Sequence, residues 1–153
     1  MKRWLAFIVT LLLFCLPVYA EEGTALSLDS SPASNGLAEI AVVLNGNPGF
    51  VSYQLDIAYD AACLQPLELT SGIGGMPAYN FLEADDQSSC VKVAYASAMP
   101  VQENGELFRI RFQIRETLSA GQSAALRLEN VHFYSQDGTE FTLTLKDGQI
   151  YVP

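Results

Sequence analysis

The chain has 153 residues, of which half are hydrophobic, and it carries a formal charge of −9 at pH 7. This length suits a single domain that buries a core of its own. Only eight lysines and arginines stand against seventeen acidic residues, whereas binding to phosphate backbones or to anionic membrane surfaces depends on clustered basic side chains. Nucleic acids and anionic membranes are therefore excluded as expected partners.

The first 20 residues have the pattern of a secretory signal peptide. Lys2 and Arg3 precede an apolar run at residues 4–16, and small residues lead to Ala20. The apolar run is shorter than the roughly 20 residues that a membrane span needs, and no later segment approaches that length. We predict cleavage after Ala20, a secreted protein without a membrane span, and a mature domain at residues 21–153. Loss of the two basic residues lowers its net charge from −9 to −11.

Apolar and polar side chains then alternate with a period of two, a pattern that predicts β-strands. It recurs at residues 39–44, 51–59, 91–96, 108–115, 126–129, 141–146 and 149–152. Turn-forming stretches separate these segments, and their residue types supply positive φ angles or a preset bend. They occupy residues 45–49, 72–77, 103–105, 137–138 and 147–148. We predict an all-β fold, an antiparallel two-sheet sandwich of eight or nine strands.

The segment at residues 51–59 presents two contrasting faces. One face carries large apolar side chains and belongs to the core: Tyr53, Leu55, Ile57 and Tyr59. The other face is small and mildly acidic: Ser52, Gln54, Asp56 and Ala58. The sequence leaves two interpretations of this second face open, an ordinary solvated surface or a docking surface for another protein.

Two cysteines, Cys63 and Cys90, remain after Cys15 has left with the signal peptide. An even number of cysteines in an exported protein favours a disulfide. Closing this loop would contribute about 3 to 4 kcal/mol in the chain-entropy model. Two buried free thiols are the alternative.

The few side chains that could act in catalysis or bind a metal predict no enzyme, no cofactor and no metal site. The only histidine is His132, and a nucleophilic triad or a zinc site needs partners that this chain lacks. Asp85 and Asp86 lack the ligand spacing of a calcium loop and are expected in a solvated connection. Asp137 and Gly138 are expected to form a hairpin turn.

A carbohydrate-binding function would depend on aromatic rings exposed at the surface. Tyr79 and Phe81 would be either an exposed sugar platform or, as we expect, core residues of a short strand. The only tryptophan, Trp4, belongs to the signal peptide. A sugar-binding sandwich would therefore need other tyrosines or phenylalanines in a row on its surface.

Three segments together resemble a cohesin domain. Residues 47–69 (NPGFVSYQLDIAYDAACLQPLEL) are similar to the cohesin strand that ends in a YD-P-x-x-L pattern. Residues 91–100 (VKVAYASAMP) and 105–114 (GELFRIRFQI) are similar to an AxAS-type strand followed by a hydrophobic strand. The stretches NVHFYSQDGTEF and DGQIYV resemble the final hairpin and closing strand, so that the resemblance covers residues 26–152.

The resemblance implies a nine-stranded jelly roll and a non-catalytic module that binds a dockerin-like partner, with calcium held by the partner. It places the docking surface at Ser52, Gln54, Asp56, Lys92, Ala94, Ala96, Ser97 and Met99. Val131, Phe133 and Ser135 are further candidates from a late strand. It also makes the strands near Cys63 and Cys90 antiparallel neighbours, which favours the disulfide.

The sequence departs from the family pattern at three positions. Ser52 and Gln54 stand where many cohesins have Asn and Asp, and Ala61 stands where a Pro usually follows the YD pair. The alternative function is a carbohydrate-binding or adhesive β-sandwich module with a polysaccharide partner.

Overall fold

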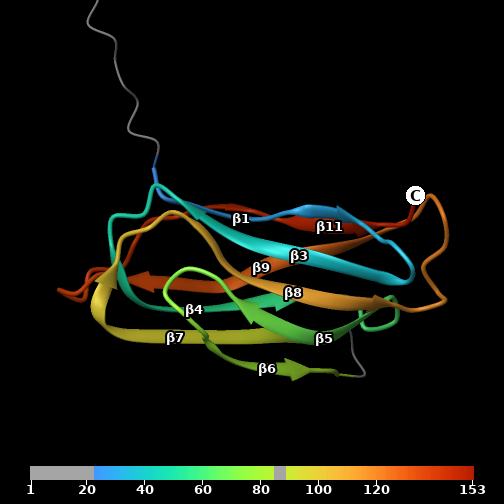
Figure 1. The fold of residues 1–153 in the computed structure, drawn as a ribbon, viewed down its shortest axis with the longest axis horizontal. Helices are drawn as coiled ribbons and strands as arrows, with labels where there is room; N and C mark the ends of the chain where they lie inside the picture. Colours follow the sequence, from blue (N-terminus) through green and yellow to red (C-terminus); the bar gives the residue numbers. More distant parts are fainter. Residues whose placement is uncertain (1–22, 85–88) are drawn as a thin grey trace, which may run out of the picture.

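The computed structural model describes residues 23–84 and 89–153, and in this part of the chain two β-sheets lie face to face (Figure 1). It contains eleven strands rather than the predicted eight or nine, because short terminal segments also pair. The strands are β1 (Ala25–Leu28), β2 (Ser30–Pro32), β3 (Leu37–Asn45), β4 (Phe50–Ala58), β5 (Leu64–Ser71), β6 (Ala78–Leu82), β7 (Cys90–Val101), β8 (Gly105–Ile114), β9 (Ser123–Tyr134), β10 (Thr144–Lys146) and β11 (Gly148–Tyr151). The predicted all-β sandwich is confirmed.

One sheet has five strands in the order β10-β1-β3-β8-β5, and the other has six in the order β2-β11-β9-β4-β7-β6. Most neighbours are antiparallel, as predicted, but β1 pairs with β10 and β11 pairs with β2 in parallel. Both sheets are therefore mixed at one edge. The reason is that the chain crosses between the sheets after β1 and again after β10, in the same direction.

The two crossing points touch, and this contact determines the role of Gly148. A Cβ atom at this position would lie 2.4 Å from the carbonyl oxygen of Asp29 and 2.8 Å from Cβ of Leu28. Gly148 is not among the residues with positive φ, although the Asp147-Gly148 pair predicted a turn of that kind. The glycine is required here for close approach of two backbones rather than for a left-handed conformation.

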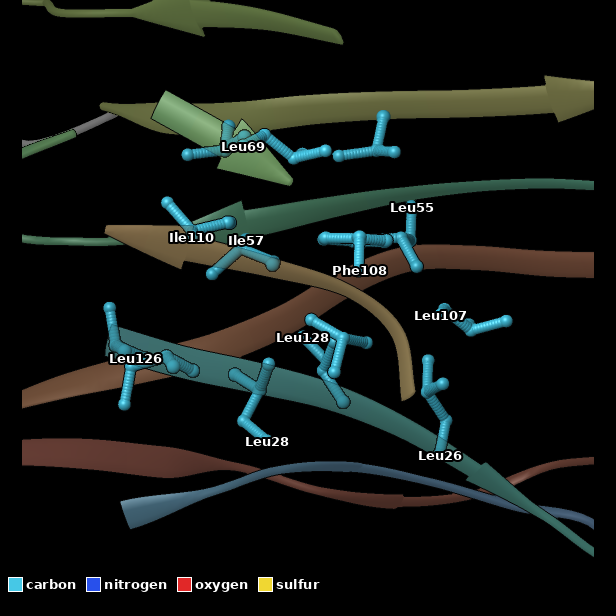
Figure 2. Packing of buried hydrophobic residues seen from close by; sticks show 14 of the residues in the cluster. Leu26, Leu28, Leu55, Ile57, Leu69, Leu107, Phe108, Ile110, Leu126 and Leu128 are labelled. Carbon is cyan, nitrogen blue, oxygen red and sulfur yellow. The ribbon is translucent and has the colours of Figure 1, made fainter. Parts of the chain in front are cut away.

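The hydrophobic core fills the space between the sheets. Figure 2 shows side chains of the five-stranded sheet, such as Leu26 and Ile110, pointing toward side chains of the six-stranded sheet, such as Leu55 and Leu126. All four are at most 1% exposed. The predicted apolar faces of residues 39–44, 51–59 and 91–96 lie in this core, because a pleated strand directs alternate residues to one side.

The predicted strand at residues 141–146 is wrong in extent. Only Thr144–Lys146 forms a strand, and Leu145 is 44% exposed. Phe141 and Leu143, which precede the strand, are partly buried against the core. The residues that the structure describes include no helix long and apolar enough to cross a membrane.

Candidate functional site

The outward side of β4 and β7, in the middle of the six-stranded sheet, is the candidate site. Three cross-strand pairs lie directly opposite one another: Ser52 with Ala96, Gln54 with Ala94, and Asp56 with Lys92. Residues two apart on a strand share one face of a sheet. These six predicted site residues therefore lie together, and we call them the flat face.

Ser97 and Met99 lie beside the flat face rather than in it. The pairing of β4 with β7 shifts between Phe50 and Ser52, so that four residues of β7 bulge outward opposite Val51. The Ser97 hydroxyl donates to the carbonyl of Met99 (2.8 Å) and accepts from its backbone N–H (3.2 Å). This turn holds the backbone while the Met99 side chain, 71% exposed, projects at the rim of the flat face.

Asp56 is fixed by two donors. Lys92 Nζ and Asn130 Nδ2 each lie 2.8 Å from Asp56 Oδ2. The Asp56 side chain is 13% exposed and that of Lys92 is 52% exposed, so the lysine remains accessible while the carboxylate is largely covered. The hydrogen bond that Lys92 donates to Asp56 raises the pKa of the lysine and so favours its charged form.

Strand β9 adds His132 and Tyr134 to this side of the sheet, which the sequence interpretation missed. His132 lies opposite Gln54, and Tyr134 lies opposite Ser52. The two rings stack with centroids 6.5 Å apart. His132 Nδ1 lies 2.5 Å from Glu140 Oε1.

Of the three further candidates from the late strand, Val131 and Phe133 face the core, and Phe133 is fully buried. Ser135 follows β9, and its hydroxyl donates to Asp137 Oδ1 in the turn. A bulge opposite Gln54 and Asp56 inserts one residue into β9 and reverses which positions face inward. Even-numbered residues are buried up to Leu128, whereas beyond it Val131 packs partly buried against the core and Phe133 is buried. This change of parity is visible in the sequence and was the signal that could have found His132 and Tyr134.

A groove of about 530 Å³ crosses the flat face toward β6. It is lined by Gln54, Asp56, Ala78, Tyr79, Asn80, Lys92, Val93, Ala94 and Asn130. The prediction that Tyr79 and Phe81 are core residues is wrong for Tyr79, which is 41% exposed, while Phe81 is partly buried. Strand β6 is the outermost strand of its sheet, so its inward side is only partly covered (Figure 1).

The described residues do not present the row of exposed aromatic rings that a sugar platform needs. Tyr53 and Tyr59 are 3% exposed and belong to the core. Tyr95 is partly buried and donates its hydroxyl to the Gly74 carbonyl at 2.6 Å. Tyr79 on β6 and Tyr151 on β11 are exposed, but three strands, β9, β4 and β7, lie between them in the sheet.

The outward face of the five-stranded sheet differs sharply from the flat face. Arg111 bridges Glu39 (3.2 Å) and Glu68 (2.9 Å), and Arg109 bridges Glu106 (2.6 Å) and Glu39 (3.5 Å). Long charged side chains thus cover this surface and neutralise one another. A partner would have to displace or order them, whereas the short side chains of the flat face need little ordering.

Asp137, an acidic residue singled out in the sequence, has a structural role in a turn. Asp137 Oδ1 accepts hydrogen bonds from the Ser135 hydroxyl and the Thr139 N–H, which lower the pKa of its carboxyl. Gly138 has a φ of 83°, and the predicted hairpin turn is confirmed. Asp85 and Asp86 lie outside the described residues. Within the described ranges, no cluster of three or more His, Cys, Asp or Glu side chains is arranged to hold a metal.

Cys63 and Cys90 are free thiols in the structure, so that the predicted disulfide is not formed. The strand pairing behind that prediction is correct, since Cys90 lies opposite Ala58 at the end of β4. Cys63, however, belongs to the turn that carries the chain to the other sheet. Its thiol donates to Asp60 Oδ2 at 3.6 Å, and its carbonyl accepts from Arg115 N–H. Burial raises the pKa of both thiols.

Comparisons with known proteins agree on one family. The family model described as Cohesin domain matches residues 25–152. The fold is similar to that of the type I cohesin–dockerin complex Coh-OlpA-Doc918 from Clostridium thermocellum, with 20% identity, a TM-score of 0.74, and coverage of 86% of this chain and 99% of that chain.

Two further solved structures are similar. A non-cellulosomal cohesin from the hyperthermophilic archaeon Archaeoglobus fulgidus has 20% identity and a TM-score of 0.70, with 86% of this chain and 91% of that chain covered. CaCohA2 from Clostridium acetobutylicum has 16% identity and a TM-score of 0.73, with the same coverage of 86% and 91%. No curated protein is significantly similar in sequence.

Proposed function

The chain belongs to the cohesin domain family, and we propose that it is a non-catalytic module that binds a dockerin-like partner through the flat face. One observation carries the proposal: Ser52, Gln54 and Asp56 face Ala96, Ala94 and Lys92 across two adjacent strands. This arrangement offers a shallow surface of short side chains with a few fixed polar groups. A partner helix would lie across it at a small entropic cost, because most of these side chains are short and Lys92 is already held by Asp56.

The polar groups on this surface support hydrogen-bonded recognition. Lys92 and Asn130 both donate to Asp56, so a partner need not supply a compensating charge for this carboxylate. Gln54 is exposed in the centre, where its amide offers both a donor and an acceptor. The exposed thioether of Met99 supplies an adaptable apolar contact at the rim.

The experiment is a pull-down with the domain from residue 21 onward, which contains every residue of the hydrophobic core, from the secretome of its own source. It is performed with calcium and with a chelator, because the calcium is expected on the partner. Gln54→Arg and Ala94→Arg place a long charged side chain on the flat face. Gln113→Arg is the matched control, since Gln113 is also an exposed glutamine but lies on β8 of the other sheet.

Recovery of a dockerin-bearing protein by the wild type and by Gln113→Arg, but not by the two flat-face variants, supports the proposal. Failure of the folded wild type to recover any dockerin-bearing protein overturns it, and binding to a glycan array would then favour the carbohydrate-binding alternative. Recovery of the dockerin-bearing protein by both flat-face variants would mean that the docking surface lies elsewhere on the domain.

We also propose that the domain is exported, on the basis of the signal-peptide pattern in residues 1–20, which lie outside the described residues. Mass spectrometry of the protein from its own source should find a mature chain that begins at Glu21. A chain that retains Lys2 and Arg3 in the mature protein contradicts export through this segment.

A further inference from the structure

The sandwich has four outer strands, and three of them carry features that oppose pairing with another strand. Strand β10 has only three residues and ends in Lys146. Strand β2 also has three residues and ends in Pro32. Strand β5 contains Pro66, and its register shifts between Pro66 and Glu68. Short length, lysine, proline and bulges are the means by which natural sheets prevent edge-to-edge association.

Strand β6 has none of these features. Its five residues, Ala78–Leu82 (AYNFL), include no charge and no proline, and four of them are exposed. It pairs with β7 along its whole length without a register shift. Within residues 23–84 and 89–153, the only hydrogen bond to β6 outside that pairing comes from the Tyr59 hydroxyl to the Leu82 carbonyl, at 3.4 Å.

We propose that β6 is a self-association edge, at which the β6 strands of two copies of this chain pair in antiparallel fashion and join two six-stranded sheets into one. An antiparallel pair of identical strands has a two-fold axis, which is the symmetry of most homodimers. With the axis at Asn80, Tyr79 of one copy lies opposite Phe81 of the other. These two rings already lie 5.2 Å apart within one copy, so pairing gathers four aromatic rings.

Charge explains why a second copy is accepted despite the acidity of the domain. No ionisable acidic or basic side chain lies within β6, so the paired segment brings no like charges opposite one another. Glu83, the next residue, is joined to Arg115 at 2.9 Å. The remaining net negative charge of the domain acts over longer distances and is weakened by salt, so association strengthens as the ionic strength rises.

The pairing also has a consequence for docking. Strand addition takes place in the plane of the sheet, and the flat face lies on β4 and β7, inward of β6 in the strand order. A two-fold axis perpendicular to the sheet places both flat faces on the same side of the dimer. The dimer then presents two docking surfaces side by side, which raises avidity for a partner with repeated modules.

The test is analytical ultracentrifugation of the domain from residue 21 onward in moderate salt. A five-residue edge gives a small, weak interface, and we expect the weight-average mass to rise from one chain toward two between about 10 and 500 µM. Tyr79→Asp puts a negative charge on each copy at the paired edge and should abolish this rise. Tyr151→Asp is the matched control, because Tyr151 is 39% exposed, close to the 41% of Tyr79, but lies on β11 at the other side of the sheet.

Far-UV circular dichroism establishes that both variants are folded. Loss of the mass increase in Tyr79→Asp with its retention in Tyr151→Asp supports the proposal. A wild-type domain that remains monomeric throughout this range overturns it, as does a dimer that persists in Tyr79→Asp. Dockerin capture in the pull-down does not require the dimer, so failure here leaves the proposed function intact.

Discussion

The hydroxyl of Tyr53 is buried without a hydrogen-bond partner, and its removal is therefore expected to leave stability unchanged or to increase it. The Tyr53 ring stacks on Phe133 and Tyr95, with centroids 4.9 and 5.4 Å apart, and meets the edge of Phe50 at 5.6 Å. Its hydroxyl oxygen is inaccessible and unpaired. Tyr53→Phe keeps every ring contact and removes only this oxygen.

The magnitude follows from the energetics of buried polar groups. An unsatisfied buried hydroxyl destabilises the folded state by about 1 to 3 kcal/mol relative to water. Removal of the hydroxyl recovers only part of this free energy, because the small space left by the oxygen loses packing contacts. We expect Tyr53→Phe to raise the free energy of unfolding by up to about 1 kcal/mol. Tyr95→Phe loses the hydrogen bond to Gly74 and should lower it by about 0.5 to 1.5 kcal/mol.

Urea unfolding followed by far-UV circular dichroism measures both effects. With a slope of about 1 to 2 kcal/mol per M for a domain of this size, the two midpoints should move in opposite directions by roughly 0.5 M each. A Tyr53→Phe midpoint that falls as far as that of Tyr95→Phe refutes the reasoning. It would mean that the Tyr53 hydroxyl has a partner, such as a buried water molecule.

Three further outcomes are expected. Gly72→Ala should destabilise the domain by more than about 2 kcal/mol in the same assay, because its Cβ would lie 1.9 Å from the Glu106 carbonyl oxygen, whereas Gly23→Ala, with nothing within 4 Å, should be neutral. Burial raises the pKa of Tyr59 to about 12, so the folded state holds this proton more tightly than the unfolded state. The stabilisation is therefore complete below about pH 10 and is lost as the pH rises toward 12. Tyr59→Phe should show a smaller loss of urea midpoint than the wild type between about pH 9 and pH 11. The denatured domain should react with two equivalents of a thiol reagent, and the native domain more slowly at both cysteines, as their raised pKa values require; an absence of reactive thiols in denaturant would indicate a disulfide.

The strands that lie in the middle of the sheets could be predicted from the sequence. Their alternation is strict because one side of each strand is buried, and β4 and β7 therefore had only one arrangement that places Tyr53 and Val93 inside. The same constraint fixes the opposite side, which is why Gln54 and Ala94 could be assigned to one surface. Burial of one face thus determines the composition of the other.

The outer parts of the fold could not be predicted in the same way. Strands β2 and β10 have three residues each, too few for a period to appear, and their parallel pairing depends on where the chain crosses between sheets. Tyr79 alternates as a core residue does, yet it lies on an outer strand whose inward side is incompletely covered. Coverage depends on the strand order, which a local pattern does not contain.

Asn130 has two roles beside the flat face: it lies at the bulge in β9, and it holds Asp56 in place. Its φ of 50° is a left-handed conformation that asparagine tolerates better than most residues, and it lies at the bulge that turns His132 outward. The same residue donates to Asp56 at 2.8 Å. A larger apolar residue at this position would lose both effects, the conformation and the hydrogen bond. The bulge therefore adds β9 to the surface available to a partner, and Asn130 within it holds the Asp56 carboxylate that Lys92 also binds. Geometry and charge at the candidate site thus depend on a single backbone irregularity.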